Sequence, residues 1–136
     1  MNQKSNTTGI SGHKSDSFFS VVIPTYNRAH ILPETIKSVL DQTYQKYEII
    51  VVDNGSTDNT SDVVKSFDDF RIRYFYQLGS GSPASPRNKG IVESLGDWIA
   101  FLDSDDYWYP EKLAQVADAV AEQSCELVSH YQQVQN

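Results

Sequence analysis

Short apolar runs, each followed by polar and turn-forming residues, recur along most of the chain. They cover residues 18–24, 47–52, 72–77 and 98–102. Continuous runs of this length, rich in β-branched and aromatic residues, are typical of strands covered on both faces in a parallel sheet. A last apolar stretch, 126–134, is a candidate for a further strand.

Apolar residues at helical spacing predict a helix after each of the first four strands. Helices are expected over 32–40, 63–67 and 87–95, and a long one begins at Pro110. Gly96 is expected to cap the third of these helices. Strands that alternate with helices predict an α/β fold with three layers, α/β/α, around a mainly parallel sheet with right-handed crossovers.

The two ends of the chain differ in composition. Residues 1–17 are mostly Ser, Thr, Asn, Gly and Lys, which leaves almost nothing to bury, so we expect a disordered leader. Residues 18–136 form one domain in this interpretation. A chain of 136 residues with 39% apolar and 12% aromatic residues has enough apolar material for a packed core.

Charge and cysteine content restrict the partners and the compartment. The net charge of -7 argues against nucleic acid, because binding to a phosphate backbone depends on clustered Lys and Arg. The single cysteine, Cys125, cannot form an internal disulfide, so we expect a reducing compartment, with the cytoplasm as the default. No apolar run approaches the length of about 18 residues that a membrane span needs. Any association with the inner face of a membrane is therefore expected through segments not present here.

The loops that follow the strands are the candidates for a binding site. In parallel α/β sheets, ligands bind at the carboxyl ends of the strands. The loops that begin there are expected at 25–28, 53–58, 78–87 and 103–107. Because these loops open at one edge of the sheet, their side chains can contribute to one site.

The loop after the fourth strand is acidic. Asp103 and Asp105 are two residues apart, and in an extended chain such residues project to the same side. Converging carboxylates suit Mg²⁺ or Mn²⁺, which prefer oxygen ligands and leave positions for substrate phosphates, as in a nucleoside diphosphate. The alternative is that residues 103–106 form a solvated turn whose acids favour the N-terminus of the next helix.

Other residues after predicted strands suit a nucleotide. Asp53 ends the second strand, where an acidic side chain can accept hydrogen bonds from a nucleoside. Tyr26 follows Pro24 and Thr25, and its ring can stack on a flat base. Arg87 begins a helix, where positive charge suits phosphate oxygens. Taken singly, each also fits an ordinary role as a turn aspartate, a surface tyrosine or a solvated helix charge.

Two other kinds of site have less support. The histidines have no metal-like spacing and there is no Cys-x-x-Cys, so we expect no zinc site. Gly79, Gly81 and Ala84 satisfy the dinucleotide pattern G-x-G-x-x-A after a strand. Pro83 and Pro86 are expected to delay the helix, and the first strand–turn–helix unit carries PTYNR instead. An NAD-dependent dehydrogenase therefore stays a less favoured alternative.

Several segments occur in a characteristic order, namely SVVIPTYNR, SVLDQTY, EIIVVDNGSTDNT, SPRNKGI and DWIAFLDSDDYW. Together they resemble the family 2 glycosyltransferases, which have a GT-A fold with a Rossmann-like nucleotide-binding half. The resemblance runs from Phe19 to the helix after Pro110. It implies a bacterial enzyme of polysaccharide or cell-surface glycan synthesis that uses Mn²⁺ or Mg²⁺ and a UDP-, GDP- or dTDP-linked sugar. The sugar would be transferred, with inversion, to a hydroxyl of a glycan or a lipid-linked acceptor.

The resemblance also implies roles for single residues. Pro24 and Tyr26 would flank the base, Asp53 would bond the base edge and Asp103 would approach the ribose. Asp105 would hold the metal of the DxD motif. The implied nucleotide site as a whole comprises Pro24, Thr25, Tyr26, Asp53, Arg87, Asp103 and Ser104. One departure from the family pattern is Asn54, where many members carry a second aspartate.

The resemblance implies that the acceptor pocket and the general base belong to a second half of the catalytic domain, beyond residue 136. We therefore expect the domain at 18–136 to be truncated before that half and assign no general base in this chain. A non-catalytic nucleotide-binding module stays open as an alternative. A sheet without its second half is also expected to expose apolar surface, which predicts self-association.

Overall fold

The computed structural model of the chain describes residues 16–79 and 84–123, and strands and helices alternate along these residues. The strands are β1 (Phe19–Thr25), β2 (Tyr47–Asn54), β3 (Ile72–Gln77) and β4 (Trp98–Phe101). The helices are α1 (Leu32–Leu40), α2 (Thr60–Lys65), α3 (Ala84–Glu93) and α4 (Lys112–Gln123). The predicted α/β class is confirmed.

All strands of the sheet are parallel, in the order β3-β2-β1-β4. The chain extends the sheet from β1 in one direction through β2 and β3, and then returns to the other side of β1 to form β4. The strand order therefore reverses between β1 and β4. In open parallel sheets the ligand crevice lies at such a switch point, outside the carboxyl ends of the strands.

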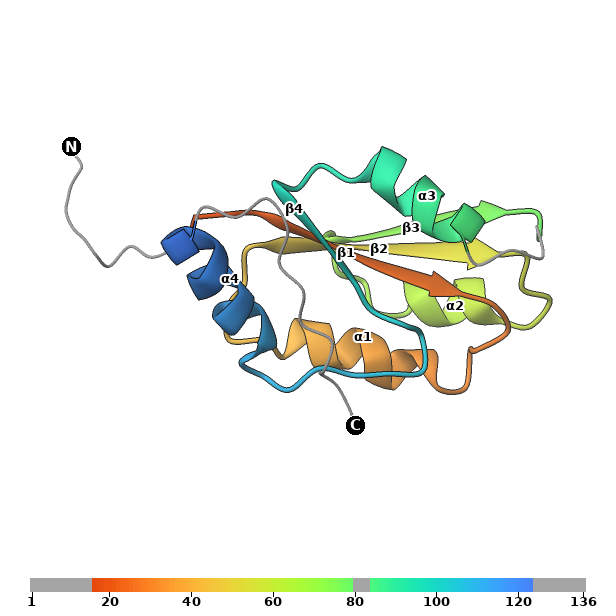
Figure 1. Cartoon of the computed structure of the whole chain (residues 1–136). Helices are drawn as coiled ribbons and strands as arrows, with labels where there is room; N and C mark the ends of the chain where they lie inside the picture. The colour runs from red at the N-terminus through yellow and green to blue at the C-terminus, as the bar shows by residue number, and fades with distance from the viewer. Residues whose placement is uncertain (1–15, 80–83, 124–136) are drawn as a thin grey trace.

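Helices cover both faces of the sheet, with α3 on one face and α1, α2 and α4 on the other (Figure 1). Successive strand residues point to opposite faces. Val21 and Ile23 accordingly pack with Leu32 of α1 and Leu113 of α4 in the larger core, whereas Val22 belongs to a smaller core on the α3 side. The predicted three-layer arrangement is confirmed.

Helix α3 packs very close to β1 because Gly90 has no side chain. A Cβ atom on Gly90 would lie 2.3 Å from Cγ1 of Val22, so a larger residue would push the helix away from the sheet. Arg87 lies one turn earlier on the same helix. The Gly90 contact therefore also positions a predicted site residue.

Some details of α3 differ from the prediction. The helix covers Ala84–Glu93 rather than 87–95, and Pro86 lies in its first turn, where the missing N–H breaks no helical hydrogen bond. The expectation that Pro86 delays the helix is wrong. The dinucleotide pattern is still disfavoured because it lies in the third strand–helix unit rather than in the first. Gly96 does not cap the helix. Its N–H donates to Ser20 Oγ at 2.8 Å, and a Cβ there would lie 2.7 Å from the backbone nitrogen of Ser20, so Gly96 permits a close approach to β1.

The predictions for the chain ends are only partly covered by the structure. Helix α4 begins at Lys112, two residues after Pro110. The predicted strand at 126–134 and residues 1–15 of the predicted leader lie outside the described residues. Within the part of the chain that the structure describes, none of the helices combines the length and the apolar character needed to cross a bilayer.

Candidate functional site

A pocket of about 330 Å³ opens at the switch point of the sheet. Its walls come from the loop after β1, the end of β2, the first turn of α3 and the loop after β4. The residues that line it are Pro24, Thr25, Tyr26, Arg28, Asn54, Pro86, Arg87, Asp103, Ser104 and Asp105. These segments are far apart in the sequence, and the parallel sheet brings them together.

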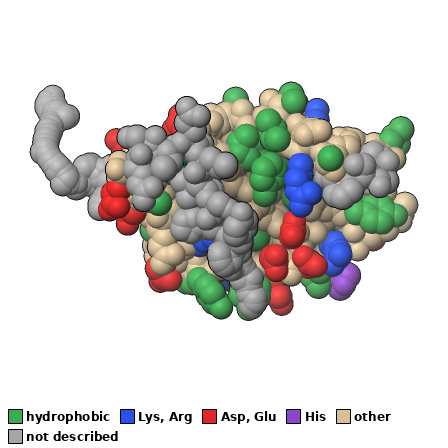
Figure 2. All heavy atoms as spheres, in the orientation of Figure 1, with side chains coloured by type: hydrophobic (Ala, Val, Ile, Leu, Met, Phe, Trp, Pro, Cys, Tyr) green, Lys and Arg blue, Asp and Glu red, His purple; other side chains and the backbone are tan. Residues whose placement is uncertain are grey.

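Three carboxylates converge at this pocket. One oxygen from each of Asp103, Asp105 and Asp106 lies within 4.8 Å of the others. The backbone N–H of Asp106 donates to the carbonyl oxygen of Asp103 at 3.0 Å, so the chain turns here. The expected convergence of Asp103 and Asp105 is observed, but a turn rather than an extended chain produces it, and the turn adds Asp106. Figure 2 shows acidic side chains gathered on this face with basic side chains beside them.

Helix α1 holds the main chain of the acidic loop in place. The hydroxyl of Thr35 lies 2.9 Å from the carbonyl oxygen of Ser104 and 2.6 Å from that of Asp106. Farther along the segment after β4, a backbone N–H donates to Ser38 of α1 at 3.1 Å, and a backbone carbonyl accepts from Gln42, two residues after the end of α1, at 2.7 Å. These bonds satisfy main-chain groups that would otherwise be costly to bury. The loop is therefore anchored through its backbone, which leaves its carboxylates available.

Arginines from two other elements approach these carboxylates. Arg28 Nη1 lies 3.3 Å from Asp105 Oδ2, and Arg87 Nη2 lies 3.3 Å from Asp103 Oδ1. The Arg87 guanidinium also lies 6.0 Å from the ring centre of Phe101. The side chains in both pairs are 40% to 57% exposed, so each pair contributes little to stability. Among residues 16–79 and 84–122, none forms an ion pair with Asp106.

The electrostatics of the acidic loop favour a cation. Burial raises the pKa of Asp106, and the charges of Asp105 and Asp103 raise it further. A divalent cation between the carboxylates would relieve this repulsion. The ligand atoms on offer are all carboxylate oxygens, which fits Mg²⁺ or Mn²⁺ better than zinc with its nitrogen and sulfur ligands. The residues present thus fit the predicted metal.

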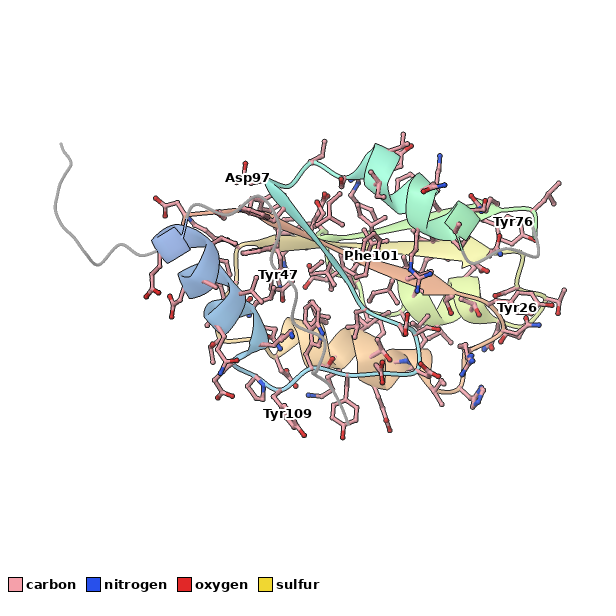
Figure 3. The ribbon with its side chains drawn as sticks, viewed as in Figure 1. Tyr26, Tyr47, Tyr76, Asp97, Phe101 and Tyr109 are labelled. Atoms are coloured by element: carbon pink, nitrogen blue, oxygen red, sulfur yellow. The ribbon has the colours of Figure 1, made fainter. Side chains whose placement is uncertain are left out.

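The loop after β1 brings an aromatic ring and a buried hydroxyl to the pocket. Tyr26 is 55% exposed and lies at the carboxyl end of the sheet, whereas Asp97 lies at the opposite end (Figure 3). Thr25 is buried, and its Oγ1 has no hydrogen-bond partner among the described residues. Buried hydroxyls without a partner are uncommon. This atom therefore suits contact with a bound ligand.

The loops after β1 and β2 are tied together by side-chain hydrogen bonds. The N–H of Asn27 donates to Ser56 Oγ at 2.7 Å, and the N–H of Thr57 donates to Asn27 Oδ1 at 2.8 Å. The N–H of Ala29 donates to Asp58 Oδ2 at 3.2 Å. Asn27 has a φ of 50°, in the left-handed region that asparagine adopts more readily than most residues. The rim of the pocket is thus preformed on this side.

Asp53 lies apart from the pocket. It is 1% exposed, and its carboxylate accepts hydrogen bonds from the N–H of Ser56 at 2.8 Å and from the hydroxyl of Tyr74. Burial and the bond to Asp53 raise the pKa of Tyr74. The pocket wall at this point is formed by Asn54 instead. A bond from Asp53 to a base edge is untested and stays a prediction.

The structure therefore brings together most of the predicted site residues. Those that line the pocket are Pro24, Thr25, Tyr26, Arg87, Asp103, Ser104 and Asp105, and Asp53 does not. Arg28 also lines the pocket, and the carboxylate of Asp106 lies beside those of Asp103 and Asp105, although neither residue was assigned a role from the sequence. Their place in the sequence next to predicted site residues could have identified them, because Arg28 ends the segment PTYNR and Asp106 ends the run of acids after β4.

Comparison with known proteins identifies the family that this chain resembles. Residues 20–133 match the family described as Glycosyl transferase family 2. One relative is the UDP-Glc:alpha-D-GlcNAc-diphosphoundecaprenol beta-1,3-glucosyltransferase WfgD of Escherichia coli, which is 41% identical over 98 residues, or 72% of this chain and 39% of WfgD. Across the curated relatives that we compared, the chain spans between 14% and 43% of the relative's length.

Solved structures show the same fold. Residues 1–349 of S. aureus TarS in complex with UDP match with a TM-score of 0.75 and 33% identity, over 79% of this chain and 33% of that one. The mannosyltransferase PcManGT from Pyrobaculum calidifontis, in complex with GDP-Man and Mn²⁺, matches with a TM-score of 0.69 and 25% identity, over 81% and 33%. The sheet, the pocket at its switch point and the match over residues 20–133 lead to one conclusion: this chain belongs to glycosyltransferase family 2.

Proposed function

We propose that this chain is the donor-binding part of a glycosyltransferase that moves a sugar from a nucleoside diphosphate to an acceptor hydroxyl, with inversion. The observation that carries the proposal is the meeting of three carboxylates and two arginines at the switch point of the sheet. UDP in the TarS structure, and GDP-Man with Mn²⁺ in the PcManGT structure, support a nucleoside diphosphate sugar and a divalent cation as ligands.

Several residues at the pocket have a role in this proposal. Asp105, with Asp103 and Asp106 beside it, would hold Mn²⁺ or Mg²⁺, which when bound stabilises the departing diphosphate as a Lewis acid. Arg87 would donate charge-assisted hydrogen bonds to the nucleotide. Tyr26 would stack on the base, and Thr25 would gain a hydrogen-bond partner. We assign no general base to the described residues.

Calorimetric titration of the chain with UDP and GDP tests the proposal. We expect binding that needs Mn²⁺ or Mg²⁺ and disappears with a chelator. Asp105→Asn should lower the affinity for the nucleotide with Mn²⁺ by at least about 100-fold, because it removes a charged metal ligand. Asp41→Asn is the matched control, since Asp41 is a similarly exposed aspartate in an ion pair with Lys37, and it should bind as the unchanged chain does.

Other results would favour other functions. UDP or GDP binding that is unaffected by chelation and by Asp105→Asn would indicate a non-catalytic nucleotide-binding module. Binding of NAD, without binding of UDP or GDP, would indicate the dehydrogenase alternative. Either result would contradict a metal-dependent donor site.

For the whole protein we propose a glycan or lipid-linked acceptor and a role in polysaccharide or cell-surface glycan synthesis at the cytoplasmic side of the membrane. WfgD, whose name specifies a diphosphoundecaprenol-linked acceptor, supports this proposal. The test is transfer of labelled sugar to undecaprenyl-linked acceptors by the longer protein. Absence of transfer to any lipid-linked acceptor, with transfer to a free glycan, would exclude the lipid-linked class.

We also propose that the chain self-associates. Among the strands that the structure describes, β4 lies at an edge of the sheet, and it and the adjoining α3 segment expose Ile91, Val92, Leu95, Ile99 and Phe101. Exposed apolar side chains beside an edge strand favour association. Light scattering at rising concentration tests this, and a mass that stays monomeric would contradict it.

A further inference from the structure

The proposed function gives Arg28 no individual role, although Arg28 belongs to the charged cluster at the pocket and pairs with the proposed metal ligand. Its Nη1 lies 3.3 Å from Asp105 Oδ2, and the two side chains are 44% and 49% exposed. Both residues line the pocket. The oxygen that Arg28 contacts is therefore on the carboxylate that a bound cation would need.

The main chain around Arg28 is fixed. The N–H groups of its neighbours Asn27 and Ala29 donate to side-chain oxygens of the β2–α2 loop at 2.7 and 3.2 Å. Its own carbonyl oxygen accepts the N–H of Leu32, at the start of α1, at 2.8 Å. The long side chain of Arg28 is consequently the part that can change partners while the loop stays in place.

A divalent cation at Asp105 would compete with Arg28 in the free site. A carboxylate oxygen that accepts a hydrogen bond from a guanidinium offers less negative potential to a metal ion. A nucleoside diphosphate changes the balance, because phosphate oxygens bind a guanidinium with two parallel hydrogen bonds and also bind the cation. With both ligands present, the diphosphate would be a better partner for Arg28 than Asp105 is, and Asp105 would be free for the metal.

We propose that Arg28 exchanges partners during donor binding, from Asp105 in the free site to the diphosphate in the loaded site. This inference rests on the function proposed above, which supplies the cation and the nucleotide. Arg28 is then a positioning residue that couples the two ligands. It weakens binding of the cation alone and strengthens binding of the nucleotide with the cation.

The exchange predicts opposite effects of one substitution on two affinities. Calorimetry with Mn²⁺ alone should show tighter binding by Arg28→Gln than by the unchanged chain, by up to about fivefold, the value of an exposed ion pair. Titration with UDP at saturating Mn²⁺ should show weaker binding by Arg28→Gln, by about tenfold, because a charge-assisted hydrogen bond is lost. Arg28→Lys keeps the charge but cannot form two parallel hydrogen bonds. It should therefore also raise the Mn²⁺ affinity and lower the UDP affinity, each by a smaller factor than Arg28→Gln does.

The matched control is Lys37→Gln, which removes an exposed ion pair on α1 away from the pocket and should leave both affinities unchanged. Circular dichroism and urea midpoints establish that each variant is folded. If Arg28→Gln does not fold, Arg28→Lys carries the same readouts.

Only a gain in Mn²⁺ affinity together with a loss in UDP affinity supports the exchange. A change in one affinity alone, shifts of both in the same direction, or no shift would overturn it while leaving the proposed function standing. An unchanged chain that binds no UDP with Mn²⁺ would overturn the proposed function and the exchange together.

Discussion

Two carboxylate sites at opposite ends of the sheet differ in the number of partners that the protein provides. Glu48, at the start of β2, is 4% exposed. Its oxygens accept hydrogen bonds from Ser20 Oγ at 2.6 Å, the N–H of Leu95 at 2.8 Å and Arg73 Nη1 at 2.9 Å. These bonds join β1, β2, β3 and the segment after α3. Glu48 is thus a structural residue whose hydrogen-bonding capacity is used internally.

The acidic loop after β4 has the reverse arrangement. Its main chain is bonded to α1, whereas Asp103 and Asp105 each pair with one exposed arginine at 3.3 Å among the described residues. A carboxylate bonded on all sides by the protein has little to offer a ligand, while clustered carboxylates with few partners favour a cation. In this protein, the structural acid and the candidate ligand-binding acids carry the same charge and differ in how many hydrogen-bond partners the protein provides.

The pKa values of the two sites move in opposite directions. Burial raises the pKa of Glu48, but hydrogen bonds from Ser20, the Leu95 N–H and Arg73 outweigh burial and hold it below its ordinary value. Burial and neighbouring acids raise the pKa of Asp106. The protein therefore stabilises the ionised form of Glu48 and disfavours that of Asp106.

The largest effect on stability is expected for Glu48→Ala. Breaking a buried ion pair costs about 3–5 kcal/mol, and we expect about 2–3 kcal/mol here because the Arg73 side chain keeps some contact with water. Urea denaturation measures the loss. Glu34→Ala, on the exposed side of α1, is the control and should change stability by less than about 0.5 kcal/mol. Equal losses for both variants would show that Glu48 is not a structural residue.

An intermediate effect is expected for Thr35→Val. This substitution keeps the shape of the buried side chain and removes the hydroxyl that contacts the carbonyl oxygens of Ser104 and Asp106. A buried carbonyl without its partner costs about 1–3 kcal/mol. Thr43→Val removes a longer, exposed bond to Pro110 and should cost less than about 0.5 kcal/mol in the same urea measurement. Indistinguishable midpoints would mean that α1 does not anchor the acidic loop.

The smallest effect is expected for Asp106→Asn, with a gain in stability at neutral pH of up to about 0.5 kcal/mol. The pKa of Asp106 is higher in the folded state than in the unfolded state, so ionisation of Asp106 opposes folding at neutral pH. The gain from Asp106→Asn should disappear as the pH falls below the unfolded-state pKa of about 3.9, where the carboxyl group is protonated in both states.

Glu48→Gln should behave in the opposite way over the same pH range. Because the folded pKa of Glu48 is lowered, its contribution is present above about pH 4.3 and is lost as the pH falls through the folded pKa. The destabilisation by Glu48→Gln should therefore shrink at low pH. Urea midpoints measured across the acidic range decide the comparison, and parallel pH profiles for the two variants would refute it.

Much of the fold could be predicted from local patterns. The runs at 18–24 and 47–52 locate β1 and β2 to within two residues, because central strands of a parallel sheet are apolar on both faces. The limits of α3 were less accurate, since Pro86 is compatible both with a loop and with a first helical turn. Most of the site residues could also be predicted, because the carboxyl ends of parallel strands meet at one edge.

The sequence by itself determined the alternation of strands and helices, the acidic loop at a strand end and the family resemblance, because all of these depend on the order of residues along the chain. Only the tertiary structure decided that Arg28 and Asp106 join the site and that Asp53 is buried and does not line the pocket. It also decided that Glu48 is a structural acid. The physical reason is that the charge state and availability of a carboxylate depend on partners from distant segments, which no local pattern of residues specifies.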